Sequence, residues 1–327
     1  MATLARGRRS RNPLAAEDNV AGWVFLLPAL VIFVGFIFGP IFYVAWLSFR
    51  EWQVVTPEKP WVGLDNYRAI FDNDDFYIAF RNTLWFSLGV VPTQTAIGLF
   101  LAVLANRKIR GKTFFRTAFY FPSISSSIVI SIIFLWLYQN DGLINFLLRA
   151  IGISPPRPPW LQNPNGVIEQ FLGLFGVGDI SPWFEGPSFA LLSIMMLNIW
   201  TTAGTMMVIF LAGLQDVPGD VYEAAALDGA SRWQQFKDIT VPLLRPVTLF
   251  VVTLGFIGTF QVFDQALAMT EGGPGTATTP LVMYIYQVGF RSFYMGYAAA
   301  IAWVLFAIVF FFTLIQFWFQ RRWVSYD

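Results

Sequence analysis

Six long apolar runs limit what this chain can fold into more than any other feature of its sequence. Each run is close to the roughly 20 residues that cross a hydrocarbon core; the runs are residues 23–49, 83–104, 114–138, 189–214, 247–269 and 298–319. Only 13% of the 327 residues are charged, against about 25% in soluble domains. In lipid the backbone polar groups must pair inside the protein, which favours helices. We therefore predict an all-α integral membrane protein with six transmembrane helices.

The composition also excludes several kinds of chemistry. The chain has no Cys and no His, which rules out disulfides, Cys or His zinc sites, thiol catalysis and Ser-His-Asp triads. Its formal net charge is +1, so no basic field points to nucleic acid. We expect no catalytic residue, no metal site and no nucleic-acid partner.

Positive charge predicts the orientation of the helices. If the N-terminus is cytoplasmic, the segments 1–22, 105–113, 215–246 and 320–327, together with Arg116, hold 14 of the 21 Lys and Arg residues. The acidic stretch around Asp72 then lies outside. The first run is longer than a signal-peptide core, so we interpret it as a retained anchor. The predicted organisation is a cytoplasmic segment 1–22, a membrane domain 23–319 and a cytoplasmic tail 320–327.

A long segment, residues 139–188, follows the third run on the predicted outer side. Its Pro-rich and Gly-rich stretches favour turns and extended chain over a separate domain. The sequence VIEQFLGLF in its middle predicts a short amphipathic helix that rests on the membrane or on a neighbouring subunit.

A polar hairpin, EAAALDGASRWQQFKDITVPLLRP at 223–246, interrupts the apolar pattern. We expect Asp220 and Glu223 to form a capping box at the start of an alanine-rich helix. Gly229 predicts a left-handed stop. Ser231 and Gln234 predict a second capping box, and Val241-Pro242 is expected to end the second helix.

Three interpretations of this hairpin are open. It is a plain loop between spans, a DNA-reading helix–turn–helix, or a docking surface for a cytosolic protein. Glu223 and Asp228 would repel phosphate, which argues against DNA. Two successive caps around a compact bend favour the docking surface over a plain loop.

The hairpin resembles the coupling motif of permease subunits in binding-protein-dependent ABC importers. The motif is EAA-x-x-DGA followed by F-x-x-I-x-x-P-x-x-x-P, and Phe236, Ile239, Pro242 and Pro246 match its second part. The resemblance implies that the residues that couple to the ATPase are Glu223, Ala224, Ala225, Asp228, Gly229 and Ala230. GLDNY at 63–67, FRTAFYFP at 115–122 and EGGPGTATTPL at 271–281 resemble the carbohydrate and polyol branch of the family.

The resemblance also implies a fold, partners and a location. The fold would be the six-helix type I importer permease with a cytoplasmic coupling helix, in a bacterial or archaeal cytoplasmic membrane. The implied partners are a second permease subunit that is a different chain, two ATPase subunits and an extracytoplasmic solute-binding protein. ATP and Mg²⁺ would bind to the ATPase subunits, and this chain would bind no cofactor. Its GKT at 111–113 is no P-loop, because Asn106 stands where the first glycine is needed.

Polar residues inside the apolar runs are candidates for a solute path, because such residues are costly in lipid unless they face a cavity or a partner. By their helical spacing, and by resemblance to the maltose-type cavity, the candidates are Ser123, Ser127, Asn198, Thr202, Thr205, Phe260, Gln261, Phe263 and Asp264. Hydroxyl and amide groups beside aromatic rings suit a sugar or polyol. The alternative is that these side chains only hold neighbouring helices together.

Two other functions were weighed against an importer permease. A secondary transporter driven by an ion gradient would favour inverted repeats and an embedded ion site, and the two halves show no convincing repeat. An intramembrane enzyme would need an acid–base or metal constellation at membrane depth, and the sequence offers a single embedded carboxylate, Asp264.

Overall fold

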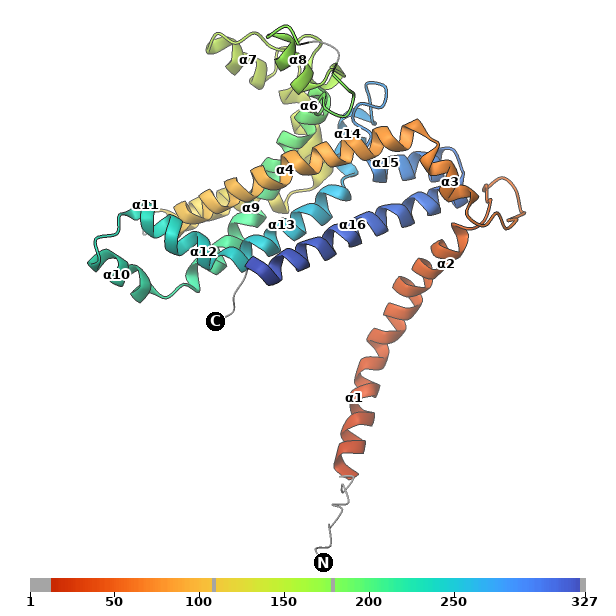
Figure 1. Ribbon diagram of the computed structural model, residues 1–327, viewed down its shortest axis with the longest axis horizontal. Coiled ribbons are helices and arrows are strands. Elements are labelled where there is room, and N and C mark those ends of the chain that lie inside the picture. Colours follow the sequence, from red (N-terminus) through yellow and green to blue (C-terminus); the bar gives the residue numbers. More distant parts are fainter. Residues whose placement is uncertain (1–12, 108–109, 178–179, 324–327) are drawn as a thin grey trace, which may run out of the picture.

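The computed structural model describes residues 13–107, 110–177 and 180–323, with side chains from 21 to 318. This part of the chain forms helices and three isolated β-bridges, and it contains no strand (Figure 1). Both findings agree with the predicted all-α class.

Four helices run side by side and form the body of the molecule (Figure 1). They are α4 (Asp74–Asn106), α9 (Phe189–Gln215), α13 (Arg245–Phe260) and α16 (Met295–Trp323). One end of this bundle carries α10 (Gly219–Leu227), α11 (Arg232–Gln234) and α12 (Val241–Leu243), and we name it the α10 end. The opposite end carries α3 (Asp65–Phe71) and α15 (Leu281–Tyr286), and we name it the α3 end.

Length and composition identify the helices that can cross a membrane within the described residues. Four stretches qualify alone: Ala21–Leu47, Asp74–Asn106, Phe189–Gln215 and Met295–Trp318. Two bent pairs raise the number to six if each pair is one span: Lys112–Ile124 with Ser127–Leu137, and Arg232–Leu243 with Arg245–Phe260.

The first stretch extends away from the bundle (Figure 1). It consists of α1 (Pro13–Ile32), a short π-helix (Phe33–Phe38) and α2 (Gly39–Leu47). None of the residues in its apolar window is buried, and its last helix, α2, packs against α16.

The GLDNY motif holds the end of this first stretch in place. The Asn66 amide donates to the backbone oxygens of Ser48 and Arg50, at 2.9 Å each. A Cβ on Gly296 would lie 2.0 Å from the Arg50 oxygen, so only glycine fits there. The motif is therefore a structural clip at the α3 end.

The third apolar run is not one helix, contrary to expectation. α5 (Lys112–Ile124) and α6 (Ser127–Leu137) meet at a bend of 98°. Ser125 has an extended backbone, and its hydroxyl donates to the Phe121 oxygen at 3.1 Å. Pro122 has no N–H for the last turn, and serine hydroxyls compete with the helical ladder. Together these effects end the helix.

The fifth run is interrupted as well. α13 ends at Phe260, and α14 (Asp264–Thr270) begins after three residues outside both helices. α14 packs against α6, so the short helices that follow the two breaks lie together.

The 139–188 segment lies beyond α6, at the top of Figure 1. It contains α7 (Leu143–Ala150), a 3₁₀ turn (Trp160–Gln162) and α8 (Val167–Gly173). α8 confirms the helix predicted from VIEQFLGLF, whereas α7 was not predicted. On α7 the polar Asn145 is buried, and its amide oxygen accepts a hydrogen bond from the Trp160 indole at 2.8 Å.

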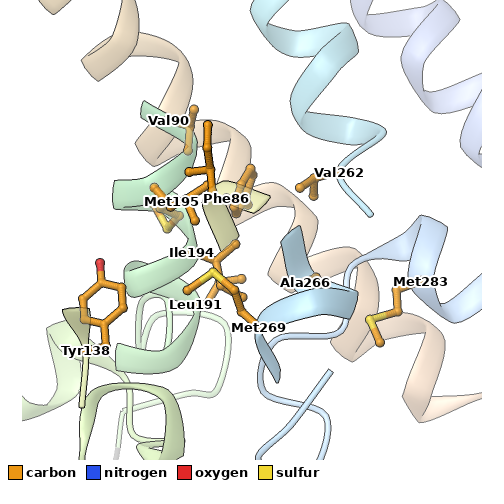
Figure 2. Close-up of a cluster of buried hydrophobic side chains, with 12 residues drawn as sticks. Phe86, Val90, Tyr138, Leu191, Ile194, Met195, Val262, Ala266, Met269 and Met283 are labelled. Atoms are coloured by element: carbon orange, nitrogen blue, oxygen red, sulfur yellow. The ribbon is translucent and has the colours of Figure 1, made fainter. Parts of the chain in front are cut away.

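A buried apolar cluster joins the bundle to the helices beyond the breaks (Figure 2). It contains Phe86 and Val90 of α4, Leu191 and Ile194 of α9, and Met269 of α14. In lipid such contacts stabilise through close packing, so this cluster holds α14 against α4 and α9.

Gly204 lets α5 approach α9 closely. A Cβ at this position would lie 2.3 Å from the Phe119 backbone oxygen and 3.0 Å from the Tyr120 Cα. We expect Gly204→Ala to push the helices apart and to lower the stability by about 1–3 kcal/mol. The measurement is the thermal unfolding midpoint of the detergent-solubilised protein. Gly258→Ala is the matched control, because no atom lies within 4 Å of its Cβ position; equal midpoints for the two variants would contradict this account.

Candidate functional site

The hairpin at the α10 end, residues 219–243, is rigid at its bend, and we name it the elbow. Gly229 has φ +82°, as its predicted left-handed conformation requires. The Gly229 N–H donates to Ala226 O at 3.1 Å, and the Ala230 N–H donates to Ala225 O at 2.9 Å. These two bonds form the Schellman motif that closes a helix C-terminus. The bend therefore has one defined conformation.

The second cap is confirmed, but the first is not where it was expected. Ser231 and Gln234 form the complete capping box. At the first helix the N-cap is Pro218, and Asp220 lies inside the first turn without a capping box. The helix begins directly after the proline, so the Asp220 carboxylate faces the positive end of the helix dipole instead.

The end of the second helix also differs from expectation. A short π-helix (Gln235–Thr240) follows α11 and continues into α12. The helical stretch therefore ends at Leu243 and not at Val241-Pro242. Pro242 lies in the first turn of α12, directly after the π-helical segment. The Tyr222 and Thr240 hydroxyls are hydrogen-bonded at 2.9 Å and tie α10 to this second segment.

The elbow presents its tip to the surroundings. Leu227 is 90% exposed and Trp233 is 68% exposed, although both are large apolar side chains. Glu223, Ala224, Asp228 and Gly229 are exposed as well, and Ala225 and Ala230 are half-buried. No atom lies within 4 Å of the Gly229 Cβ position. A rigid, narrow elbow with an apolar tip and acidic flanks is suited to insertion into a groove of another protein. Leu227 and Trp233 were missed by the sequence analysis.

Two polar cavities lie where the two broken helices meet. Their volumes are about 170 Å³ and 160 Å³, and both are lined by Ser127 and Gln265. The first is also lined by Asn198, Gly258, Gln261, Val262, Phe263 and Asp264. The second is also lined by Pro122, Ser123, Ser125, Ile130, Thr201, Thr202 and Thr205. All the predicted path residues except Phe260 therefore line one cavity or the other.

Amide and hydroxyl groups hold the cavity walls in register. The Asn198 amide on α9 donates to the Gln265 side-chain oxygen on α14 at 2.8 Å. The Thr202 hydroxyl donates to the side-chain oxygen of Gln94 on α4 at 2.5 Å. Such bonds satisfy groups that would be costly if left unpaired away from water.

Ser123 links helices and also lines a cavity. Its hydroxyl donates to the Thr201 oxygen at 2.5 Å and accepts from the Thr205 N–H at 3.2 Å. For Ser123, therefore, the alternative role is observed: its side chain holds α5 and α9 together. Gln261 and Asp264 are exposed to the first cavity.

Two residues differ from the expected site. Phe260 is only 2% exposed and packs its ring on Phe256 and Phe312, so it belongs to the helix packing. Gln94 lines neither cavity, but it is the buried partner of the wall residue Thr202 and was not predicted from the sequence. The sequence did contain a signal for it: Gln94 is an amide within the apolar run 83–104, and such a group is costly in lipid without a partner.

Carboxylates do not gather in this region. Within the described residues, no group of three or more Asp or Glu side chains is placed to hold a metal ion. The site consists of hydroxyl and amide groups, the Phe263 ring and one carboxylate, Asp264, which can bind and orient a solute.

Comparison with known proteins agrees with these features. Residues 94–325 match the model of a family described as the binding-protein-dependent transport system inner membrane component. The probable ABC transporter permease YesP of Bacillus subtilis is 35% identical over 95% of this chain and 94% of its own length. The trehalose/maltose transport system permease MalF of Thermococcus litoralis is 32% identical over 92% of this chain and 94% of its own length.

Solved structures show the same fold. A chain of a bacterial ABC transporter that imports alginate has a TM-score of 0.77 and 22% identity, over 97% of this chain and 100% of that chain. The fold is that of an ABC importer permease, as the resemblance implied. The elbow and the cavities agree with this assignment, and the match over most of the chain shows the family. This chain belongs to the binding-protein-dependent transport system inner membrane components, the permease subunits of ABC importers.

Proposed function

We propose that this chain forms half of the membrane conduit of an importer for a sugar, an oligosaccharide or a polyol. The polar cavity region at the two helix breaks carries the proposal, because hydroxyl and amide groups, together with the Asp264 carboxylate and the Phe263 ring, suit a hydroxylated solute. The names of relatives support the class. MsmF of Streptococcus mutans belongs to a multiple sugar-binding system, and LacF of Rhizobium radiobacter belongs to a lactose system.

A permease subunit is a transport component and not an enzyme. ATP and Mg²⁺ bind to two separate ATPase subunits, and an extracytoplasmic binding protein delivers the solute. The α10 end faces the cytoplasm together with both termini, because the Lys and Arg residues gather there. The 139–188 segment and the α3 end then face outward.

A second permease subunit completes the conduit. Each cavity is smaller than the roughly 300–1,000 Å³ of ordinary ligand pockets. The first helical stretch has no buried residue in its apolar window, which leaves its surface for another chain. We expect this second subunit to be a different polypeptide, with a coupling elbow of its own.

The breaks give the conduit its moving parts. α6 and α14 each follow a break and pack against each other. A few residues outside a helix absorb large changes in backbone angle, so each break serves as a hinge. Closure of the ATPases pushes the two elbows, and the helices beyond the hinges open the cavity to the outside.

The solute class is tested on the complete purified transporter. We expect ATP hydrolysis to rise when the binding protein is added with one member of a panel of lactose, trehalose, maltose, arabino-oligosaccharides and alginate oligosaccharides. Uptake into proteoliposomes should require ATP inside. Uptake that follows an ion gradient without ATP would support the secondary transporter instead.

The elbow is tested with Gly229→Asp. Its left-handed φ strains any residue with a side chain, and a charge at the tip would disturb docking. We expect ATP-dependent uptake to fall at least about tenfold, the effect of a loss near 1.4 kcal/mol. ATPase subunits should co-purify less well, while membrane insertion is unchanged. Gly219→Asp is the control, because Gly219 lies in the first turn of α10, where an acidic residue is favourable. Normal uptake by the Gly229 variant would refute docking through this elbow.

The cavity is tested with Gln261→Ala. Gln261 faces the first cavity and is exposed, so its loss should remove a solute hydrogen bond and leave the fold intact. A neutral hydrogen bond contributes about 1 kcal/mol, so we expect the KM for uptake to rise about fivefold. Gln170→Ala, on the exposed side of α8, is the control. Thr202→Ala is a less specific probe, since it also deprives the buried Gln94 of its donor. Unchanged kinetics in the Gln261 variant would place solute selection outside the membrane.

A further inference from the structure

The EGGPGTATTPL stretch forms a loop that is bonded within itself. The Thr278 hydroxyl donates to Gly273 O at 2.8 Å, and the Thr270 and Thr278 hydroxyls are 2.7 Å apart. A Cβ on Gly272 would lie 2.5 Å from the Thr279 hydroxyl, so the turn closes only around glycine. The loop is therefore compact, and it continues directly from the C-terminus of α14.

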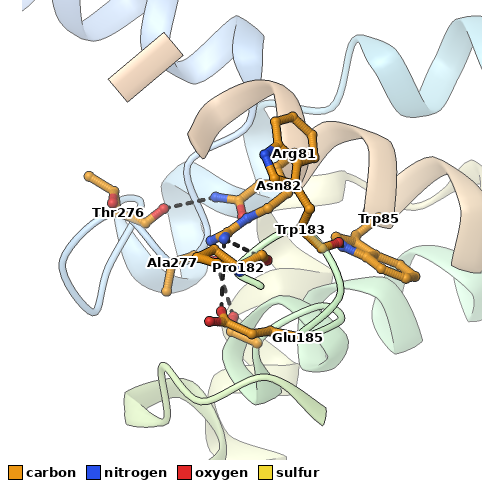
Figure 3. A network of polar contacts seen from close by, with 9 residues as sticks. Arg81, Asn82, Trp85, Pro182, Trp183, Glu185, Thr276 and Ala277 are labelled. Carbon is orange, nitrogen blue, oxygen red and sulfur yellow. Dashed lines mark hydrogen bonds and ion pairs between the residues drawn. The ribbon is translucent and has the colours of Figure 1, made fainter. Parts of the chain in front are cut away.

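One side of α4 binds this loop (Figure 3). Asn82 is 5% exposed, and its amide donates to Thr276 O at 2.8 Å and to Thr279 O at 3.1 Å. The Thr83 hydroxyl, fully buried, accepts from the Leu281 N–H at 2.9 Å. These partners lie almost 200 positions away in the sequence, so α4 fixes the loop by tertiary contacts.

The same stretch of α4 binds the end of the 139–188 segment (Figure 3). The Arg81 guanidinium donates to Pro182 O at 2.8 Å and lies 3.8 Å from the Glu185 carboxylate. The Trp85 indole donates to Trp183 O at 3.2 Å. Ser188 closes the junction, since its hydroxyl donates to Ala277 O of the loop at 3.0 Å.

Residues 181–188, which α4 binds, are also held by other parts of the chain. The Pro187 oxygen accepts from the Val167 N–H at 3.0 Å, which ties this segment to the start of α8. Phe184 on this segment is 68% exposed. A force applied to this surface therefore reaches α4 through bonded groups.

The other end of the connection is the cavity. α14 has seven residues and is about 10 Å long at 1.5 Å per residue. Its C-terminus enters the loop, and its N-terminal Asp264 and Gln265 line the cavity region. A displacement of the loop thus moves Gln265 relative to its partner Asn198.

We propose that Arg81, Asn82 and Thr83 are positioning residues that hold the 181–188 segment and the 271–281 loop as one body, and that this body transmits binding-protein docking to α14 and the cavity. The proposal rests on the proposed function, since it takes the binding protein as the partner on the outer side. A residue that only stabilised the fold would affect every activity alike. A positioning residue of this kind affects the response to the binding protein.

The test uses the complete transporter in proteoliposomes. Basal ATP hydrolysis is measured first, and then hydrolysis with saturating binding protein and the panel sugar that stimulates the wild type most. We expect Asn82→Ala to lower the stimulation about tenfold, because the Thr276 and Thr279 carbonyls lose their donor. Basal hydrolysis should stay within about twofold of the wild type, the effect of roughly 0.4 kcal/mol.

Two further variants keep the test decisive if Asn82→Ala fails to assemble. Arg81→Gln removes the ion pair with Glu185, which is partly exposed, so we expect a smaller, about threefold loss of stimulation. Trp85→Phe removes the bond to Trp183 O while keeping an aromatic ring, although a smaller one, and should act in the same direction. The control is Arg68→Gln, which removes an exposed ion pair with Asp65 elsewhere at the α3 end.

The outcomes separate the inference from the proposed function. Stimulation equal to the wild type in the Arg81 and Trp85 variants would overturn the positioning role. Basal and stimulated hydrolysis that fall in parallel would also overturn it, since that is the signature of a structural residue. A wild-type transporter that does not respond to any panel sugar with its binding protein contradicts the proposed function instead.

Discussion

The backbone of this chain must satisfy its own polar groups, and the rest of the structure depends on that constraint. In hydrocarbon an unpaired N–H or C=O costs several kcal/mol, so long stretches stay helical. The breaks at 125–126 and 261–263 occur where a side chain bonds a backbone oxygen, as Ser125 does, or where residues line a cavity. A break leaves backbone groups that need polar partners, and polar side chains in a membrane need a cavity or a partner. The breaks, the polar groups and the cavities therefore occur together.

Close helix packing is the second consequence of the bilayer. Lipid gives helices no hydrophobic reason to associate, so association depends on contact and on hydrogen bonds. Gly204 brings α9 against the backbone of α5, and Gly98 brings α4 against Met206 of α9. The Thr259 hydroxyl donates to that of Ser87 at 2.8 Å and links α13 with α4. Small and hydroxyl side chains thus define the bundle that carries the cavity.

Local signals in the sequence were sufficient for the elbow. Gly229 and the Ser231–Gln234 box act within a few residues, and both have the predicted geometry. Asp220 is not the cap, because the helix begins two residues earlier than expected, with Pro218 as its N-cap. The 98° bend between α5 and α6 was missed because an apolar run of the right length does not reveal an internal break. Partners such as Asn82 and Thr279 are invisible to local patterns, since only the tertiary fold brings them together.

The first helical stretch has a consequence for the cell that makes this protein. Its apolar window contains no buried residue, so without the second subunit proposed above this helix stays uncovered by protein. Chaperones and proteases continuously remove chains that lack stabilising contacts. We therefore expect the cellular amount of this polypeptide to follow the synthesis of the proposed second subunit.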